Sequence, residues 1–348
     1  MVAGTALFKE LLEEYRGRID EKLSNDTADR VFKDIGENAF MKRYLDAFNT
    51  YTEGGKRLRA FLVILGYNLC GRETDEDIVT ASLSYELFQS GVLIHDDIID
   101  ESDLRRNKPS MHVTLGNDKD GISKAICVGD LGILAASDAI LITGFEDELK
   151  TKAIESLHRV FKLTIAGEIK DIELASASDY TMDDIIKMYE LKTSWYTLIG
   201  PLELGLILGR ADEELLETFK EAGKDLGIAF QIRDDILGIY GASETTGKSV
   251  VSDIEEGKKT VLTSYFEAKA SYYNKEEFHS IYGKGKCDSS GAEVIGRLLE
   301  ESGARGFAEG LCREYTDKAV ELINKTDISE RYREVLFGLI EYMNDRAC

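Results

Sequence analysis

Two clusters of aspartate in this chain have the spacing needed to hold a divalent cation. Asp96, Asp97 and Asp100 end one mostly apolar stretch, and Asp234 and Asp235 end another about 140 residues later. Residues four apart lie one turn apart on one helix face, and crowded carboxylates are costly to bury unless a cation lies between them. Such oxygen ligands suit Mg²⁺, which shares carboxylates with substrate phosphates. One cluster alone could be a solvated helix face, but two in matching contexts indicate a metal site with two walls.

Basic residues gather at a few places in a chain that is otherwise strongly acidic. There are 43 Lys and Arg against 65 Asp and Glu, which gives a net charge of −22. Arginine contacts phosphate oxygens in pairs, and lysine offers a point charge. Each basic cluster alone could form surface ion pairs, but together with the acids they indicate a substrate that carries diphosphate groups. The basic clusters lie at 56–59, 105–108, 192, 248 and 258–259.

Two other local patterns carry less information. The segment Gly247-Lys248-Ser249 lacks the first glycine of a nucleotide-binding P-loop, since Ala242 stands there and no strand precedes it, so such a loop is not expected. His95 lies beside the first acidic cluster, and we expect it to be a structural hydrogen-bonding residue rather than a catalytic acid or base.

Composition argues against several classes of protein. The surplus of acids disfavours a nucleic-acid or anionic-membrane partner, because both require a basic surface. Five cysteines without a CxxC pair disfavour a disulfide framework or a zinc site, so a cytoplasmic location is expected. The first 20 residues lack the pattern of a signal peptide, and no stretch reaches 18 uncharged apolar residues, so no transmembrane segment is expected.

The elements that carry these residues are expected to be helices. Apolar residues recur at three- and four-residue steps along almost the whole chain, and the 348 residues include only 2 prolines. We therefore expect one all-α domain over residues 1–348. Helices are expected at 6–23, 27–50, 56–70, 75–101, 119–142, 147–177, 181–208, 212–240, 258–273, 291–302, 304–324 and 328–345, with loops at 54–55, 102–118, 241–257 and 283–290.

Taken together, the motifs resemble those of the trans-isoprenyl diphosphate synthases, the polyprenyl synthetase family. In the family's order and spacing they are GGKRLR at 54–59, HDDIIDESDLRRNKP at 95–109, KT at 192–193, QIRDD at 231–235 and SDIEEGKKT at 252–260. The resemblance implies a helical bundle around a deep central cavity, and a homodimer. It also implies head-to-tail condensation of isopentenyl diphosphate with an allylic diphosphate (dimethylallyl, geranyl or farnesyl) through a magnesium-assisted allylic carbocation.

The resemblance implies a role for each motif residue. Two or three Mg²⁺ ions, bound with the substrate diphosphate, would be held by Asp96, Asp97 and Asp100 from one wall and by Asp234 and Asp235 from the other. The residues implied to hold isopentenyl diphosphate are Lys56, Arg59, Gln89 and Arg106. Those implied to hold the allylic diphosphate are Arg105, Lys192, Thr193, Gln231, Lys248 and Lys258, and Lys192 joins the five aspartates as catalytic.

Three positions depart from the fullest family pattern. Gly238 stands where many members have the last aspartate of the second cluster, which leaves two acids there. Asn107 replaces a common glycine and Ala60 a common proline, and neither change removes a charge that the chemistry needs.

Product length is expected to depend on the helix that precedes Asp96, because in this family the growing chain extends beside it and bulky side chains form a floor. Val92 and Gly91, four and five residues before Asp96, are not aromatic. Phe88 is the first large side chain, about 12 Å from Asp96 at the rise of an α-helix. We therefore expect geranylgeranyl diphosphate, the twenty-carbon product, although Trp195 and Tyr196 could also close the tunnel.

Other functions remain open at this point. A farnesyl or a longer polyprenyl diphosphate synthase would share every motif. A class I terpene cyclase would share the first aspartate cluster but has no second diphosphate to hold, so GGKRLR and Gln89 disfavour it. A non-catalytic partner subunit could lose the aspartates, and this chain keeps five.

Overall fold

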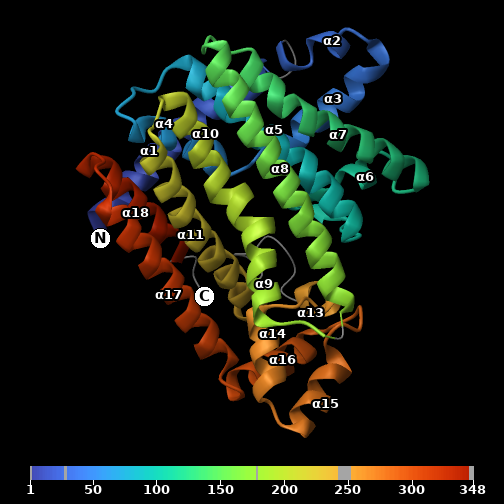
Figure 1. Ribbon diagram of the computed structural model, residues 1–348. Coiled ribbons are helices and arrows are strands. Elements are labelled where there is room, and N and C mark those ends of the chain that lie inside the picture. The colour runs from blue at the N-terminus through green and yellow to red at the C-terminus, as the bar shows by residue number, and fades with distance from the viewer. Residues whose placement is uncertain (1, 27–29, 178, 242–251, 345–348) are drawn as a thin grey trace.

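A computed structural model describes all residues except 1, 27–29, 178, 242–251 and 345–348, and it confirms the all-α fold (Figure 1). In chain order the helices are α1 Val2–Asp26, α2 Lys33–Gly36, α3 Ala39–Thr52, α4 Leu58–Leu69, α5 Glu76–Ile99, α6 Met111–Thr114, α7 Lys119–Leu141, α8 Asp147–Ser176, α9 Met182–Tyr189, the π-helix η2 Glu190–Ile199, α10 Gly200–Gly209, α11 Glu213–Tyr240, α13 Ser252–Glu256, α14 Val261–Lys269, α15 Tyr272–Ile281, α16 Ser289–Glu301, α17 Ala304–Lys325 and α18 Glu330–Asn344.

The two helices that carry the aspartate clusters both begin at an aspartate cap. The Asp75 carboxylate accepts a hydrogen bond from the backbone of Ile78 at the start of α5, and Asp212 does the same for Leu215 at the start of α11. An acceptor at this position satisfies one of the free N–H groups of the first turn. Each helix therefore starts far from the aspartate cluster that lies near its other end.

Several expected segments differ from the structure. The expected loop 241–257 contains α13, and the expected helix 258–273 ends with α14 at Lys269 and is followed by α15, which was not expected. The expected helix 27–50 is broken into α2 and α3, because Asn38 adopts an extended conformation between them. The expected loop 102–118 contains α6 and a hairpin of β1 Leu104–Arg105 and β2 Lys108–Pro109, the one sheet among the described residues. Arg106 and Asn107 both have positive φ, which a tight two-residue hairpin turn requires and asparagine tolerates well.

Residues 182–209 form one continuous helical rod, as expected, but its middle is the π-helix η2. The rod lies against α8 and α11 at two glycines. A Cβ at Gly167 of α8 would collide with the backbone of Lys192, and a Cβ at Gly227 of α11 would collide with Ser194. The two glycines therefore let α8 and α11 approach the segment that carries Lys192 and Thr193.

Helix α5 runs through the main core between α4 and α7 (Figure 1). Gly91 marks the closest approach of α5 and α7, since a Cβ at this position would meet the carbonyl oxygen of Gly129. Gly91 is thus explained by helix packing and faces α7. Phe88 is fully buried, and its ring stacks on Phe161 of α8.

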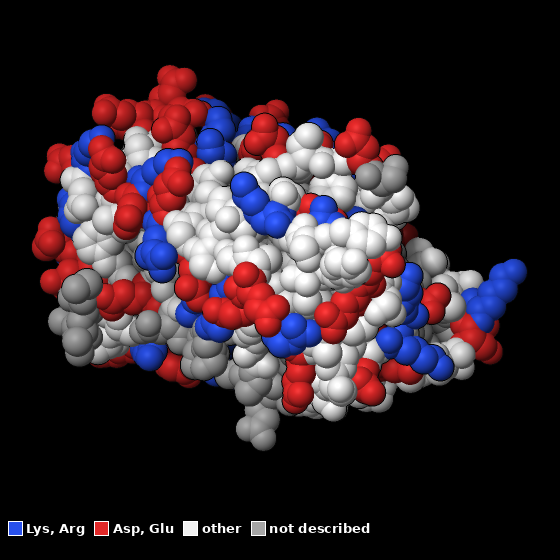
Figure 2. All heavy atoms as spheres, turned by 90° about the horizontal axis from the view of Figure 1, so that it is seen from below, with Lys and Arg blue, Asp and Glu red and all other residues white. Residues whose placement is uncertain are grey.

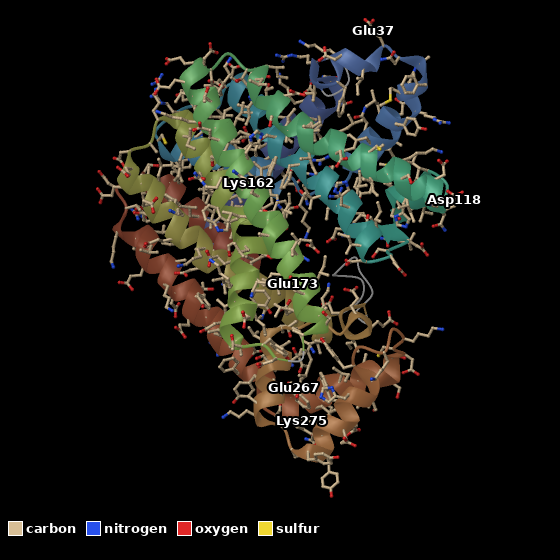
Figure 3. All side chains as sticks on the ribbon, turned by 45° about the vertical axis from the view of Figure 1, so that its right-hand side comes forward. Glu37, Asp118, Lys162, Glu173, Glu267 and Lys275 are labelled. Carbon is tan, nitrogen blue, oxygen red and sulfur yellow. The ribbon has the colours of Figure 1, made fainter. Side chains whose placement is uncertain are left out.

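The remaining helices form the two ends of the molecule. Helices α1 and α18 lie side by side, and α13 to α16 form the lower end in Figure 1. There Glu267 of α14 and Lys275 of α15 form an ion pair at 3.9 Å, and both are labelled in Figure 3. Seen from below, acidic side chains are spread over the surface with Lys and Arg among them (Figure 2). None of the described helices is both long and apolar enough to span a bilayer.

Candidate active site

The ends of α5 and α11 meet at a polar pocket of about 140 Å³. Asp96 and Asp100 reach it from α5 and the residue that follows it, and Asp235 reaches it from α11. The two aspartate clusters therefore face one space, as the sequence predicted. The pocket is lined by Asp96, Asp100, Asp171, Met188, Tyr189, Lys192, Gln231, Asp235, Lys258, Lys259 and Thr260.

Lys192 is one of the cations that line this pocket. Its Nζ atom lies 2.6 Å from Asp171 and 2.7 Å from Glu168, which follow the close contact at Gly167 on α8 by four residues and by one. Burial alone would lower the pKa of Lys192, but the charges of Asp171 and Glu168 outweigh burial and raise it. Lys192 is therefore a cation held between two acids. On the same segment, Thr193 donates a hydrogen bond to Gln231 Oε1 at 2.6 Å.

The pKa of Asp235, another acid of the pocket, is strongly shifted. Burial raises its pKa to about 8, and hydrogen bonds from Tyr189 Oη and from Gln231 Nε2 (2.9 Å) only partly oppose this. The nearby charges of Asp253 and Asp234 raise it further. At neutral pH the pocket without a cation therefore holds a proton on Asp235, which a bound cation would displace.

The space beside Gly238 is occupied by the side chain of another acid, Asp253. A side chain at this position would collide with the carboxylate of Asp253, which comes from α13. Asp253 lies 3.1 Å from Lys258 Nζ, and Glu256 lies 3.2 Å from the same atom. The missing aspartate at 238 therefore leaves room for Asp253 beside the second cluster, and for the segment that carries Lys258. Lys248, expected to share this role, lies outside the described residues.

Asp97 and Asp234 do not line the pocket. Asp97 is fully buried and receives hydrogen bonds from Tyr51 Oη at 2.7 Å and from Arg105 Nε at 2.8 Å. Arg105 Nη2 also lies 3.2 Å from Asp96. The structure thus separates the first cluster into two carboxylates that face the pocket and one that faces the protein interior and Arg105.

The residues expected to hold isopentenyl diphosphate come from different elements. Arg59 lies on α4 with Lys56 just before it, Gln89 lies on α5, and Arg106 lies in the hairpin turn. Arg59 donates to Thr197 Oγ1 at 2.9 Å and stacks over the ring of Tyr196 at 3.8 Å. Lys56 is exposed and Gln89 is half-buried. Arg106 donates to the carbonyl oxygen of Glu53 at 2.9 Å. Arg59 therefore approaches the same helical rod as Lys192, one turn further along.

Sequence reasoning missed several residues that shape this site. Glu168 and Asp171 hold Lys192, yet each is a single acid in a helix that carries many, so neither has a local signal. Arg57 is buried and forms ion pairs with Asp20 at 2.6 Å and with Glu86 at 3.1 Å. These pairs anchor the segment between Lys56 and Arg59, where α4 begins. The positive φ of Arg57 adds a constraint that the sequence does not show.

The donor set fits a cation that arrives with a phosphate ligand. Among the described residues, no three His, Cys, Asp or Glu side chains converge closely enough to hold a metal by themselves. Asp96, Asp100 and Asp235 nevertheless line one small space together with Lys192 and Lys258. Mg²⁺ in phosphate sites is held by one or two carboxylates, with water and phosphate oxygens completing the shell. A pocket lined by both carboxylates and lysines matches that requirement.

Comparison with known proteins agrees with this geometry. The family model for polyprenyl synthetase matches residues 41–298. The chain is 30% identical to the geranylgeranyl diphosphate synthase of Saccharolobus solfataricus, over 83% of this chain and 85% of that protein. It is also 30% identical to the geranylfarnesyl diphosphate synthase of Aeropyrum pernix, over 84% of this chain and 91% of that protein.

A solved structure resembles the whole chain. The geranylgeranyl pyrophosphate synthase of Corynebacterium glutamicum, complexed with isoprenyl diphosphate and magnesium, superposes with a TM-score of 0.87 at 27% identity. The similarity covers 97% of this chain and 99% of that one. From its motifs, its fold and these matches, the chain belongs to the polyprenyl synthetase family of prenyltransferases.

Proposed function

We propose that this protein condenses isopentenyl diphosphate head-to-tail with allylic diphosphates and that geranylgeranyl diphosphate is its main product. The observation that carries the proposal is the pocket that is lined both by Asp96, Asp100 and Asp235 and by Lys192 and Lys258. Acids alone would serve a cation and lysines alone an anion, so their presence around one space suits a metal-bound diphosphate. The relatives that make geranylgeranyl and geranylfarnesyl diphosphate support the same chemistry.

Asp96, Asp100 and Asp235 would hold Mg²⁺ in this pocket. When bound, Mg²⁺ would neutralise the charge that develops on the diphosphate oxygens as they leave. Lys192 and Lys258 would share that task, because both are charged and already point into the pocket. Thr193 and Gln231, which hydrogen-bond to each other, would orient the allylic diphosphate beside them.

The reaction needs a second substrate held next to the first. The allylic carbon–oxygen bond breaks, the diphosphate leaves with the electron pair, and the double bond of isopentenyl diphosphate attacks the allylic cation. A proton is then lost, and the released diphosphate is the proposed acceptor. Arg59, Arg106 and Lys56 would hold isopentenyl diphosphate, and its proximity would account for much of the rate.

A direct assay tests this function. The purified chain is incubated with Mg²⁺, labelled isopentenyl diphosphate and each of the three short allylic primers, and the products are sized by chromatography. Incorporation of label that EDTA abolishes would support the proposal. Conversion of an allylic diphosphate to a cyclic product without label would instead indicate a cyclase. A chain that is inactive alone would indicate a non-catalytic subunit.

Product length gives the first mutational prediction. Phe88 stacks on Phe161 of α8 with ring centroids 3.4 Å apart and meets the edge of Tyr196 at 5.9 Å. These rings from three helices would stop a chain that grows along α5. Phe88→Ala is therefore expected to shift the products from twenty to twenty-five or more carbons, as measured by chromatography. An unchanged product distribution would show that Phe88 is not the floor.

A matched control separates this effect from simple loss of packing. Phe278 of α15 is equally buried and lies at the lower end of the molecule, away from α5. Truncation of a buried phenylalanine costs about 3–5 kcal/mol wherever it lies. Phe278→Ala should therefore lower the melting temperature as Phe88→Ala does, while the product stays at twenty carbons.

We also propose that the protein is a homodimer. Helix α7 exposes Leu134 (66%) and Leu141 (53%), and α8 exposes Ile165 (50%) and Ile169 (53%). Lys162 and Glu173 mark the course of α8 in Figure 3. Exposed apolar side chains on two neighbouring helices are typical of a subunit interface.

We further propose that the protein is cytoplasmic and that residues 1–348 form a single domain. The cytoplasmic location is supported by the free thiols of Cys70, Cys127, Cys287 and Cys312.

Charged substitutions test the interface. Leu134→Glu combined with Leu141→Glu is expected to convert a dimer to a monomer in sedimentation experiments, because the carboxylates would be buried without partners. Tyr273→Glu is the control, since Tyr273 is 83% exposed on α15 and its replacement should leave the dimer intact. A wild-type protein that sediments as a monomer would contradict the proposal.

A further inference from the structure

The hairpin that carries Arg105 and Arg106 stands over a cavity rather than over packed side chains. A cavity of about 480 Å³ separates it from the last turns of α3, and its lining includes Tyr51, Arg105, Arg106 and Lys108. Side chains around an open space lack the dense contacts that fix rotamers in a core. The two guanidinium groups must therefore be held in place by polar contacts.

Arg105 is held through a buried relay. Tyr51 Oη donates a hydrogen bond to Asp97 Oδ2 at 2.7 Å. Arg105 donates to the other oxygen, Oδ1, through Nε at 2.8 Å and also through Nη2. The two oxygens of Asp97 are thus divided between Tyr51 and Arg105. Asp97 has no exposed surface, so water cannot replace either donor.

Arg106 is held by the backbone of the same helix end. Its Nη1 atom donates to the carbonyl oxygen of Glu53 at 2.9 Å and lies 3.5 Å from that of Tyr51. The last carbonyl groups of a helix have no partner within the helix and carry partial negative charge. The end of α3 therefore holds both arginines, Arg105 through the Tyr51 side chain and Arg106 through carbonyl groups.

We infer that Tyr51 is a positioning residue for the allylic diphosphate site and that it acts through Asp97 on Arg105. The inference rests on the function proposed above and on the roles that the family resemblance implies, in which Arg105 holds the allylic diphosphate and Arg106 holds isopentenyl diphosphate. Asp97 is then an intermediate between Tyr51 and Arg105 and does not bind metal. Arg105 Nη2 also donates a hydrogen bond to Asp96 at 3.2 Å, so the relay places this guanidinium group beside a carboxylate that lines the pocket.

The charges support this relay. Burial would lower the pKa of Arg105, but the hydrogen bonds and charge of Asp97 outweigh burial and raise it. Burial and then the charge of Asp97 raise the pKa of Tyr51, so its hydroxyl stays protonated and remains a donor. Without that hydroxyl, Asp97 would lose one of its buried hydrogen-bond donors. The remaining carboxylate could then rotate and carry Arg105 with it.

Tyr51→Phe tests the relay, because it removes only the hydroxyl. The KM for geranyl diphosphate is expected to rise by about tenfold, while the KM for isopentenyl diphosphate changes by less than about twofold, since the carbonyl groups that hold Arg106 remain. Binding of inorganic pyrophosphate with Mg²⁺, measured by calorimetry, is expected to weaken by a factor of about five or more. Asp97→Asn should act in the same direction.

A double variant tests whether the two residues act in series. If Tyr51 acts only through Asp97, the combined variant should be no worse than Asp97→Asn alone within about twofold. Tyr67→Phe is the matched control, because Tyr67 is buried and its hydroxyl also faces an aspartate, Asp75, at 3.4 Å near the start of α5. This control should leave both KM values unchanged.

Three results would overturn the inference. The first is an equal rise in the KM values of both substrates in Tyr51→Phe. The second is a double variant in which the effects of Tyr51→Phe and Asp97→Asn multiply. The third is a Tyr51→Phe protein with a lower melting temperature but unchanged KM values and pyrophosphate binding. A wild-type chain that binds pyrophosphate but makes no prenyl product would refute the proposed function instead. The pyrophosphate measurement would then still decide whether Tyr51 positions Arg105.

Discussion

Replacement of Asp96 or Asp100 with alanine is expected to reduce condensation to less than about a hundredth of the wild-type rate, a loss of about 2.7 kcal/mol in transition-state stabilisation. Both carboxylates line the pocket, which is also lined by Asp235 and Lys192. Each would hold a cation whose charge is needed only as the diphosphate leaves, so its loss should lower kcat more than it raises KM. Initial rates with geranyl diphosphate at saturating Mg²⁺ measure the effect.

The fold should survive either substitution. Removal of one of several crowded acids relieves repulsion, so the melting temperature should change little. Asp147→Ala is the matched control, because the Asp147 side chain is 99% exposed at the start of α8. It removes the same charge from the protein and should leave the rate unchanged. Retention of more than about a tenth of the wild-type rate by either pocket variant, a loss below 1.4 kcal/mol, would contradict the assignment.

Asp235→Asn is expected to lower the rate by at least about a hundredfold and to stabilise the metal-free protein. The pKa of Asp235 is raised from 3.8 to about 8 by burial. Between these two values the folded protein holds a proton that the unfolded chain has lost. The free energy of unfolding therefore falls as the pH rises from about 4 to about 8, by at most about 1.4 kcal/mol per pH unit for one group.

Asparagine resembles the protonated acid and does not titrate. The variant should therefore be more stable than the wild type in EDTA, and the difference should widen between pH 5 and pH 8. Thermal unfolding at both pH values measures this change, and Asp317→Asn at an exposed position of α17 is a control outside the pocket. A stability difference that is constant with pH would show that Asp235 is ionised in the folded protein.

The residues proposed to limit product length illustrate what the sequence of one helix can predict. Phe88 was identified by its distance along α5, which depends only on the rise per residue. Its partner Phe161 comes from another helix, and no local pattern links the two. Gly91 lies where α5 crosses α7. Sequence spacing shows which residues share a face of a helix, but it does not show which other helix packs against that face.

By itself the sequence determined the all-helical fold, the family and the two aspartate clusters. Helical periodicity, caps and motif spacing are local properties, and the residues that carry them lie within a few turns of one another. The hydrophobic pattern of α5 was enough to show that Asp96 and Asp100 share a face. For the second cluster, the apolar stretch before Asp235 was enough to predict that this residue lies at the end of a buried helix.

Only the tertiary structure decided which neighbours these residues have. Lys192 forms an ion pair with Asp171 because Gly167 lets two helices approach closely. Asp97 faces away from the pocket because Tyr51 and Arg105 donate hydrogen bonds to its carboxylate. Asp253 occupies the space that Gly238 leaves. Each of these contacts joins residues on different helices or loops. Their geometry depends on how the elements pack, and packing is set by the shapes of all the side chains between them.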